Sequence, residues 1–433
     1  MSDLLAALFV YCVIMIEKIN EKISLTFRAL RNRNYRLFFS GQCISVTGTW
    51  IQQVAINWLV YSLTKSALLM GLIMFAGSIP SLFLSPLAGV VVDRINKYHV
   101  LIILQTLFMI EALIIAILTL TGVVQIWQIV LLSISIGITN AFDMPLRQAF
   151  VVNLIDKSED LGNAISLNTS SLNLALLIGP AIAGTLIAAF GEGICFLINS
   201  LSYLAVIAAL FAMRIKTLPI RETNGTNIFQ EFHEGFKYVS SSFPMRNVIL
   251  YLATASLVGM SYIVLMPIFA KEILNGNAQT LGFLLSTAGV GALFGALYLA
   301  GKKSILGLGK WICIASLILG LGLVGLAFTT KFLIALILLF FIGFGMVVII
   351  ASCNTLVQDI VDDDKRGRVM SLYTMAFMGT TPFGSLLGGA IAHKIGVPHT
   401  FLLAGLTMII SAIIFRTKLK YFNIKARNKT IKD

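Results

Sequence analysis

The sequence predicts an all-α membrane protein with twelve transmembrane helices in two pseudo-symmetric six-helix bundles. Three observations predict this fold. Hydrophobic residues make up 58% of the 433 residues and charged residues only 12%, which leaves too little polar surface to cover a soluble globule. The apolar residues gather into twelve runs, each near the length that a tilted helix needs to cross a bilayer. Short motifs of the first half recur in the second half.

The predicted helices follow one another through short loops. Their bounds are about 37–61, 67–92, 99–121, 125–143, 161–190, 193–213, 247–270, 279–301, 309–328, 332–356, 367–393 and 397–416. A charged stretch with an amphipathic middle separates the sixth helix from the seventh. The chain therefore divides into a cytoplasmic N-terminal segment (1–36), a first bundle (37–213), a cytoplasmic linker (214–246), a second bundle (247–416) and a basic tail (417–433).

The start of the chain allows two interpretations. Its apolar run, from Leu4 to Ile16, is shorter than the roughly 20 residues that span a bilayer. No Lys or Arg precedes it, as a signal peptide would require. It is an interfacial helix, or an upstream extension of a protein that starts at Met15; we favour the second, because the segment after Glu17 already has the character of a cytoplasmic lead-in.

An internal repeat supports the two bundles. The segment Leu161–Leu167 recurs in similar form as Arg366–Leu372, and the same offset pairs Gly179 with Gly384. Two related bundles with a binding site between them are a plan that transporters use.

The basic residues give the expected orientation. Of the 32 lysines and arginines, the loops on one side hold only Lys65, Lys271, Lys331 and Lys394. The positive-inside rule therefore puts both termini in the cytoplasm, where the tail fits beside anionic lipid headgroups. This spread over short loops explains the net charge of +13 better than a nucleic-acid surface does. The five cysteines lack metal-ligand spacing and a paired framework, so we expect core packing, no metal and no cofactor.

A charged turn follows the second predicted helix. Gly89 leaves room for a close approach of helices, and Asp93 and Arg94 follow one turn later as a salt-bridging couple at the membrane surface. Lys97 continues the basic run, while Asn96 stands in place of a second glycine and tolerates the left-handed backbone expected there. This pattern resembles the loop signature of the major facilitator superfamily.

Four further blocks resemble one branch of that superfamily, which contains the enterobactin exporter and related efflux permeases. They are Leu30–Arg36, Gly48–Gln53, Ala141–Phe150 and Arg366–Tyr373. The resemblance implies a secondary transporter that exports a siderophore or a drug-like amphipathic molecule by alternating access, with proton-coupled antiport as the leading mechanism. It also implies a bacterial inner membrane, and we expect a monomer. A permease of the same fold that works by uptake or facilitated diffusion is an alternative to export. A membrane sensor that transports nothing is an alternative from another class of function.

The fifth predicted helix carries Gly179, Pro180 and Gly184, which resemble the Gly-Pro element of antiporters in the superfamily. Small residues and a proline let helices pack closely and bend. Antiporters often carry a basic residue inside the fourth helix, and none lies between Gln125 and Asp143. These two observations point in opposite directions on antiport.

Glu111 is the one acidic side chain that we place at mid-membrane, near the middle of the third predicted helix. A charged carboxylate there costs on the order of several kcal/mol, so it is protonated, paired or facing water. Two hypotheses remain open: the carboxyl carries protons coupled to export, or it fastens neighbouring helices through hydrogen bonds.

Charged residues at the cytoplasmic helix ends form a candidate gate. We interpret Asp93 and Arg94 as a latch in which Asp93 engages Arg147, or the start of a helix in the second half; a solvated loop pair is the alternative. Asp143 and Arg147 flank Pro145, which we expect to end the fourth helix, so these charges pair only if the turn persists.

The loop before the eleventh predicted helix is also crowded with charges. It holds Asp359, Asp362, Asp363, Asp364, Lys365, Arg366 and Arg368. The acids lack ordered ligand spacing and have three basic neighbours, so a solvated gate network fits better than a metal site.

Polar residues on the helices that line the central cavity of the family fold are candidate substrate contacts. In the first helix a shared face holds Trp50, Gln53 and Asn57. Comparable residues in later helices are Asn140, Tyr262 and Asn354. As a set they suit a bulky, partly polar ligand, while an interhelical hydrogen bond is the alternative for each one. A polar face of the fifth helix is assigned instead to packing against a neighbouring helix: Asn163, Ser166, Ser170 and Asn173.

Other function classes lack their motifs. The four histidines are isolated, so no nucleophile-and-base or metal arrangement of an enzyme is apparent. A phosphate loop of the Walker type is absent, as is a repeated pore-lining charge or filter of a channel. We therefore predict a transporter and not an enzyme.

Overall fold

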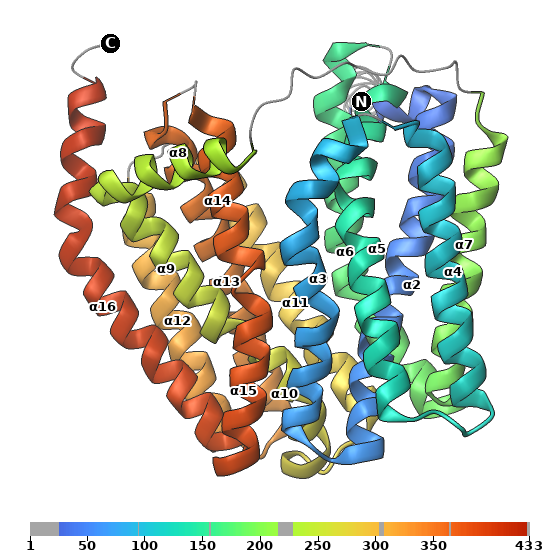
Figure 1. Cartoon of the computed structure of the whole chain (residues 1–433). Coiled ribbons are helices and arrows are strands. Elements are labelled where there is room, and N and C mark those ends of the chain that lie inside the picture. Colours follow the sequence, from blue (N-terminus) through green and yellow to red (C-terminus); the bar gives the residue numbers. More distant parts are fainter. Residues whose placement is uncertain are drawn as a thin grey trace, which may run out of the picture.

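The computed structural model describes residues 26–93, 95–155, 157–214, 228–302, 307–362 and 365–430 (Figure 1). Its first half contains η1 (Arg28–Arg31), α2 (Arg33–Thr64), α3 (Ala67–Asp93), α4 (Lys97–Leu120), α5 (Ile126–Leu154), α6 (Ser158–Phe190) and α7 (Glu192–Ala212). The linker contains α8 (Ile228–Ser241). The second half contains α9 (Phe243–Gly259), α10 (Tyr262–Ile268), η2 (Phe269–Ile273), α11 (Ala278–Ala300), α12 (Leu308–Phe328), α13 (Phe332–Ile360), α14 (Arg366–Met378), α15 (Thr381–Ile395) and α16 (Val397–Thr430).

The described helices account for the twelve expected spans. Ten segments are long and apolar enough to cross a membrane. The span α2 has lower hydropathy because it carries charged and amide side chains such as Arg36, Gln42 and Gln52. The remaining span consists of α14 and α15, which are separated at Gly379 and Thr380, so each piece is too short to qualify alone.

The expectation that Pro145 ends the fourth helix is wrong, because α5 continues through it. A proline removes one helical hydrogen bond and crowds the preceding turn. Two features of the next turns offset this cost: Leu146 and Phe150 are fully buried, and Asp143 forms an ion pair with Arg147 across the proline. Tertiary packing therefore outweighs the local signal to stop.

The seventh predicted helix, expected to be continuous, is interrupted. The helix α9 ends at Gly259, and α10 begins at Tyr262 after a short break. Pro267 lies inside α10, and the next turn, η2, is a π-helix. Because a proline lacks the backbone N–H of a regular helix, a wider turn beside it accommodates the displaced hydrogen bonds.

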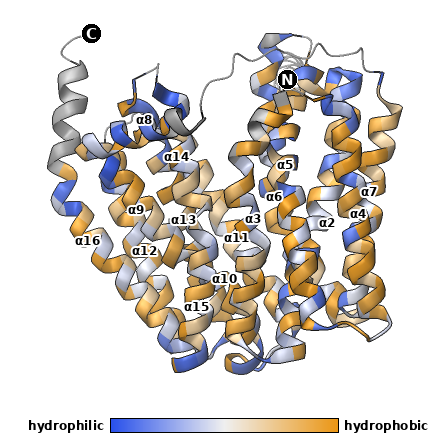
Figure 2. Ribbon diagram, viewed as in Figure 1, coloured by the Kyte–Doolittle hydropathy of each residue, from blue (hydrophilic) through white to orange (hydrophobic). Residues whose placement is uncertain are grey.

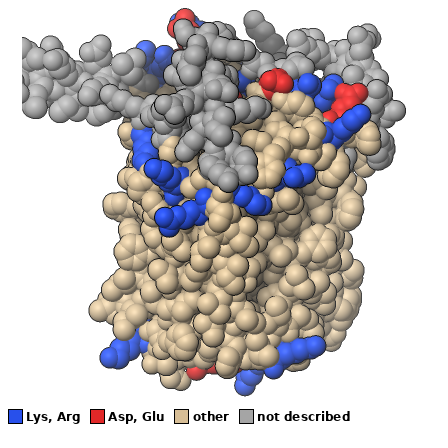
Figure 3. Space-filling view, turned by 90° about the vertical axis from the view of Figure 1, so that its left-hand side faces the viewer, with Lys and Arg blue, Asp and Glu red and all other residues tan. Residues whose placement is uncertain are grey.

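The helix ends define two faces of the molecule. The face that holds the loops after α3, α5, α7, α11 and α13 is called the basic face. The face that holds the loops after α2, α4, α6, η2, α12 and α15 is called the opposite face. Lys and Arg side chains gather along the basic face (Figure 3), and the wall between the faces is mostly hydrophobic (Figure 2). The placement of the basic face in the cytoplasm stays a prediction.

The two halves meet through α3 with α15 and through α6 with α11. Both contacts are built on glycine. A Cβ added at Gly71 of α3 would lie 2.5 Å from the carbonyl oxygen of Ser385, and one at Gly184 of α6 would lie 2.5 Å from that of Ala278. All four residues lie toward the opposite face. The close backbone contact that small residues allow therefore joins the halves at that face.

Candidate functional site

The halves are closed at the opposite face and diverge toward the basic face. At the closed end, the Tyr61 hydroxyl of α2 donates a hydrogen bond of 3.1 Å to Glu272 Oε1 of η2. Toward the basic face, α14 packs on α8 and α9, and its Arg368 pairs with Glu234 of α8 at 2.7 Å. The helix therefore leaves the path of α15, which lies against α3. The two halves are therefore packed together at one end of the molecule and apart at the other.

The polar face of α6 lies where the halves diverge. Gly184 packs on α11, and Asn173, Ser170 and Ser166 continue the same side of the helix toward the basic face. All three are exposed, and both serines donate to carbonyls of their own helix. Their assignment to packing is wrong, because α11 separates from α6 before it reaches them. Within the described part of the chain, Asn163 is the member of that face that bonds to another segment: its Oδ1 accepts from the Ala29 backbone N–H of η1, and its Nδ2 donates to the Thr26 carbonyl before η1.

Two of the candidate substrate contacts are at least partly exposed. Asn140 of α5 is exposed, and Met144 beside it, one turn later, is 49% exposed. Asn354 of α13 is half-buried, and its Oδ1 accepts a hydrogen bond of 2.6 Å from Gln358 Nε2. Gln358 is exposed and was missed in the sequence, although its spacing of one helical turn from Asn354 was a usable signal.

The other four substrate candidates make contacts between helices in the interior of the molecule. Gln53 Nε2 lies 3.0 Å from the Met74 sulfur. Asn57 and Tyr262 are buried, with 4% and 6% exposure. Trp50 packs on α6. Their surroundings favour the alternative of helix-to-helix contact for these four residues.

The Gly-Pro element of α6 lies at two helix contacts. A Cβ added at Gly179 would lie 2.6 Å from the Trp50 Cβ of α2. Pro180 lies inside α6 without ending it, and its carbonyl oxygen would lie 2.5 Å from a Cβ added at Gly282 of α11. These residues bring α6 close to both α2 and α11.

Glu111 lies between α4 and α5 with 5% exposure. Its Oε1 accepts hydrogen bonds from Ser135 Oγ and, at 3.2 Å, from Thr139 Oγ1. Its Oε2 is buried and has no hydrogen-bond partner within the described part of the chain. An ionised carboxylate is costly in such a place, and the protonated form is much less so. The surroundings therefore suit a protonated carboxyl, and this holds for both hypotheses, the proton carrier and the carboxyl that fastens helices.

A second polar cluster lies nearer the basic face. Arg147 donates to Asp143 Oδ2 and to Gln42 Oε1 of α2, and Gln105 Nε2 of α4 donates to Asp143 Oδ1 at 2.8 Å. Asp143 is 5% exposed, so the pair is a buried one supported by extra hydrogen bonds. Among the described atoms, three of this cluster remain buried without a partner: Gln42 Nε2, Gln105 Oε1 and Arg147 Nε.

Both clusters are joined by a stripe on α5. Ser135, Thr139, Asp143 and Arg147 follow one another at intervals of four residues, so they share one side of the helix. This stripe leads from Glu111 toward the basic face. Ser135 and Thr139 were missed in the sequence, where the regular interval was the available signal.

The latch residues Gly89, Asp93 and Arg94 fall outside the described side chains, so the latch stays a prediction. Lys97 begins α4. Asn96 has a φ of −72° and accepts hydrogen bonds from backbone N–H groups in the first turn of α4. The left-handed turn expected at Asn96 is therefore wrong, because a helix cap uses this side chain.

The charged loop before α14 ties that helix to the linker helix α8. Arg366 begins α14, Arg368 pairs with Glu234, and the Tyr238 hydroxyl donates to Asp362 Oδ2 at 2.6 Å. Two further acids of the loop lie outside the described residues: Asp363 and Asp364. Where the chain is described, no three His, Cys, Asp or Glu side chains group as metal ligands.

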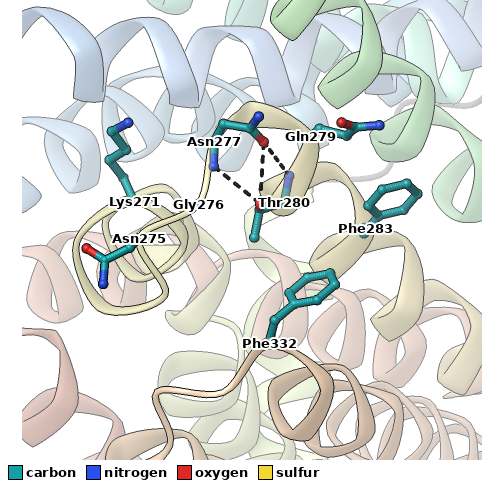
Figure 4. Close-up of a pocket in the computed structure, with 8 residues that line it drawn as sticks. All are labelled: Lys271, Asn275, Gly276, Asn277, Gln279, Thr280, Phe283 and Phe332. Atoms are coloured by element: carbon teal, nitrogen blue, oxygen red, sulfur yellow. Dashed lines mark hydrogen bonds between the residues drawn. The ribbon is translucent and has the colours of Figure 1, made fainter.

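A hollow of about 500 Å³ opens on the opposite face between η2, α11 and α13 (Figure 4). Its polar groups have structural roles: Asn277 Oδ1 accepts from the Thr280 backbone N–H at 3.1 Å and so caps α11. Asn275 beside it adopts a φ of 53° in the turn before the cap. The hollow is a feature of this turn, and its lining includes none of the six substrate candidates.

A family model described as "Transmembrane secretion effector" matches residues 24–431 of the chain. The chain is 26% identical over 381 residues to the staphyloferrin A transporter of Staphylococcus aureus, covering 88% of this chain and 95% of that protein. It is 25% identical over 376 residues to the multidrug efflux pump Tap of Mycolicibacterium fortuitum, covering 85% and 91%.

Solved structures share the fold. The nucleoside transporter NupG has a TM-score of 0.68 at 14% identity, with 90% of this chain and 99% of that chain covered. A bacterial homolog of the human lysosomal transporter Spinster, in an inward-facing conformation, has a TM-score of 0.64 at 12% identity, with 91% and 97% covered.

Proposed function

Because the chain belongs to the transmembrane secretion effector family of the major facilitator superfamily, we propose that it exports a small amphipathic molecule across the bacterial plasma membrane in exchange for protons. The chain is a multi-pass membrane transporter and not an enzyme. Relatives named for a siderophore and for drugs support a substrate that combines apolar surface with polar groups.

The observation that carries the proton coupling is the environment of Glu111. Its carboxyl is buried and accepts from two hydroxyls on one oxygen, while the other oxygen has no partner among the residues that the structure describes. The stripe on α5 provides polar groups between this carboxyl and the basic face. Proton uptake and release at Glu111 is therefore the exchange step of the proposed cycle.

Substrate and proton are coupled through α5 in this proposal. Asn140, an exposed candidate substrate contact, directly follows Thr139, which donates to Glu111. A rotation or shift of α5 on substrate binding changes the donor that holds the carboxyl. Each ligand then alters the affinity for the other, as exchange requires.

The test compares Glu111→Gln with Glu192→Gln, a carboxyl at the first residue of α7 on the opposite face. Inside-out vesicles are given a proton gradient, and accumulation of a fluorescent cation such as ethidium is measured from pH 5.5 to 8.5. We expect Glu192→Gln to keep the gradient dependence and Glu111→Gln to lose it. Normal transport by Glu111→Gln with an unchanged pH profile would refute the coupling.

The substrate is sought by untargeted mass spectrometry of cells and medium, with and without the gene, in iron-poor and iron-rich growth. A compound that accumulates inside and disappears outside in the deletion strain establishes export and names the substrate. The reverse distribution would indicate uptake. No difference in any condition, together with no ethidium flux, would favour a transport-inactive sensor.

A further inference from the structure

A groove runs between α9 and α16 in the second half. Its volume is about 200 Å³, and all of its lining residues come from these two helices. Leu250 and Ile414 on its walls are 59% and 51% exposed, so the groove faces the surroundings of the bundle. Asn247 and Lys418 close the end that lies nearest the basic face. Figure 1 shows α16 beside α9 at the edge of the second half.

The polar end of the groove carries an unneutralised positive charge. Lys418 Nζ donates to Asn247 Oδ1 at 2.6 Å, and Asn247 in turn donates to the Phe243 carbonyl at 2.7 Å. Within the described residues, Lys418 has no carboxylate partner. An ammonium group has three N–H donors, so two remain for an anion. Arg246, exposed beside Asn247, adds a second positive charge at the rim.

The two halves differ at this helix pair. In the first half, Gly41 of α2 lets α7 pack directly: a Cβ added there would lie 3.1 Å from Val206 Cα. Gly48, seven residues later on α2, meets α7 in the same way. On α9, Asn247 and Thr254 have this spacing and face the groove. On α9, side chains therefore occupy the spacing at which α2 carries glycines.

We propose that this groove binds an anionic phospholipid of the leaflet at the basic face, with an acyl chain between α9 and α16 and the phosphate on Lys418. The exposed apolar walls fit hydrocarbon, and the cationic end lies at the level where helices begin and headgroups are found. Charge complementarity favours an anionic lipid over a neutral one. The apolar groove also favours a lipid over a free anion, which gains nothing from Leu250 and Ile414.

The test measures thermal unfolding of the purified full-length protein in a neutral detergent during titration with lipid. The probes are dioleoylphosphatidylglycerol, dioleoylphosphatidylcholine with the same chains, and inorganic phosphate. A ligand that binds the folded state raises the unfolding midpoint. We expect phosphatidylglycerol to raise it at lower concentrations than phosphatidylcholine, and phosphate alone to leave it unchanged.

Four variants locate the effect. Lys418→Gln keeps a hydrogen-bonding group toward Asn247 but lacks the charge, and we expect an affinity for phosphatidylglycerol about 5-fold lower, the loss typical of one lysine near a membrane surface. Lys418→Arg restores the preference. Lys310→Gln removes an exposed lysine of α12 at the same face and leaves the preference intact. Thr254→Trp fills the groove and abolishes the response to both lipids.

Several outcomes would overturn the proposal. An equal response to phosphatidylglycerol and phosphatidylcholine would show that the groove does not distinguish an anionic headgroup from a neutral one. An unchanged preference in Lys418→Gln would place the site elsewhere. A full midpoint shift with inorganic phosphate would show a free-anion site. None of these readouts depends on transport, so they leave the proposed function unaffected.

Discussion

At the scale of single residues, the polar groups of the first half make an interior unlike that of the second. Glu111, Asp143 and Arg147 are ionisable groups within the helices of the first half. The comparable contacts of the second half are made by hydroxyls, such as Tyr251 with Ser316. An ionisable group inside a membrane protein is costly and marks function by default. The asymmetry supports a division of work in which the first half handles protons.

The ion pair of Asp143 and Arg147 gives a prediction on stability. Arg147→Gln leaves Asp143 buried without its counter-charge, and we expect a loss of about 3 kcal/mol in the free energy of unfolding. The double variant with Asp143→Asn is expected to lose less than this single variant, because no buried charge remains. Denaturant unfolding in detergent micelles provides the measurement.

A matched control for these Arg147 and Asp143 variants is the pair of Arg368 and Glu234, whose side chains are 36% and 46% exposed. Arg368→Gln is expected to cost under about 1 kcal/mol, since an exposed pair is screened by water. Equal losses at the buried and exposed pairs would contradict the structural role given to burial.

At the scale of elements, helix continuity follows packing more than proline content. The helix α5 passes through Pro145 because the next turns are buried and paired, whereas α9 stops at Gly259 with no proline there. The eleventh span is divided at Gly379, where a Cβ would lie 2.8 Å from the Leu82 side chain of α3. On the side of Gly379 toward the opposite face, α15 packs on α3. On the side toward the basic face, α14 packs on α8 and α9.

Pro145 offers a prediction for α5. Since the helix already continues, Pro145→Ala restores a missing hydrogen bond without changing the path, and we expect a gain of about 1 kcal/mol in stability. The control is Pro398→Ala in the first turn of α16, where a proline costs little and no change is expected. A less stable Pro145→Ala variant would show that the proline sets a bend that the packing needs.

At the scale of the whole molecule, the glycine contacts of α3 with α15 and of α6 with α11 hold the opposite face shut. They are backbone-to-backbone contacts, so they permit little adjustment when a side chain is added. Closure at this face and divergence at the basic face together define the state described by the structure. In the proposed transport cycle these contacts open.

Gly184→Val gives the corresponding prediction. Its Cβ would lie 2.5 Å from the Ala278 carbonyl, so α6 and α11 must move apart and the opposite face must open. We expect faster labelling of a cysteine placed at Leu177 of α6, which lies against Gly289 of α11, by a membrane-impermeant maleimide added from that side, in a background without the native cysteines. Transport should fall by at least tenfold, because the closed state is lost.

Gly162→Val, on the same helix, is the control. A Cβ at Gly162 has no neighbour within 4 Å, so the same substitution should change neither labelling nor transport. If the Gly184→Val variant were labelled at the same rate as this control, the contact at Gly184 would not be what closes the opposite face.

The sequence by itself determined the fold class, the two halves and the family. Hydropathy and repeat patterns are local properties of the chain, and a bilayer forces every apolar run of sufficient length into a helix. The motif blocks were likewise readable, because each lies within a short stretch. Glu111 was identifiable as a buried acid for the same reason.

Only the tertiary structure decided which polar groups meet and which stay free. Glu111 finds Ser135 and Thr139 on another helix, and the polar face of α6 stays exposed although its composition suited packing. The continuation through Pro145 and the break after Gly259 were settled in the same way. Each outcome depends on the free energy of contacts between distant segments, which spacing along one helix does not contain.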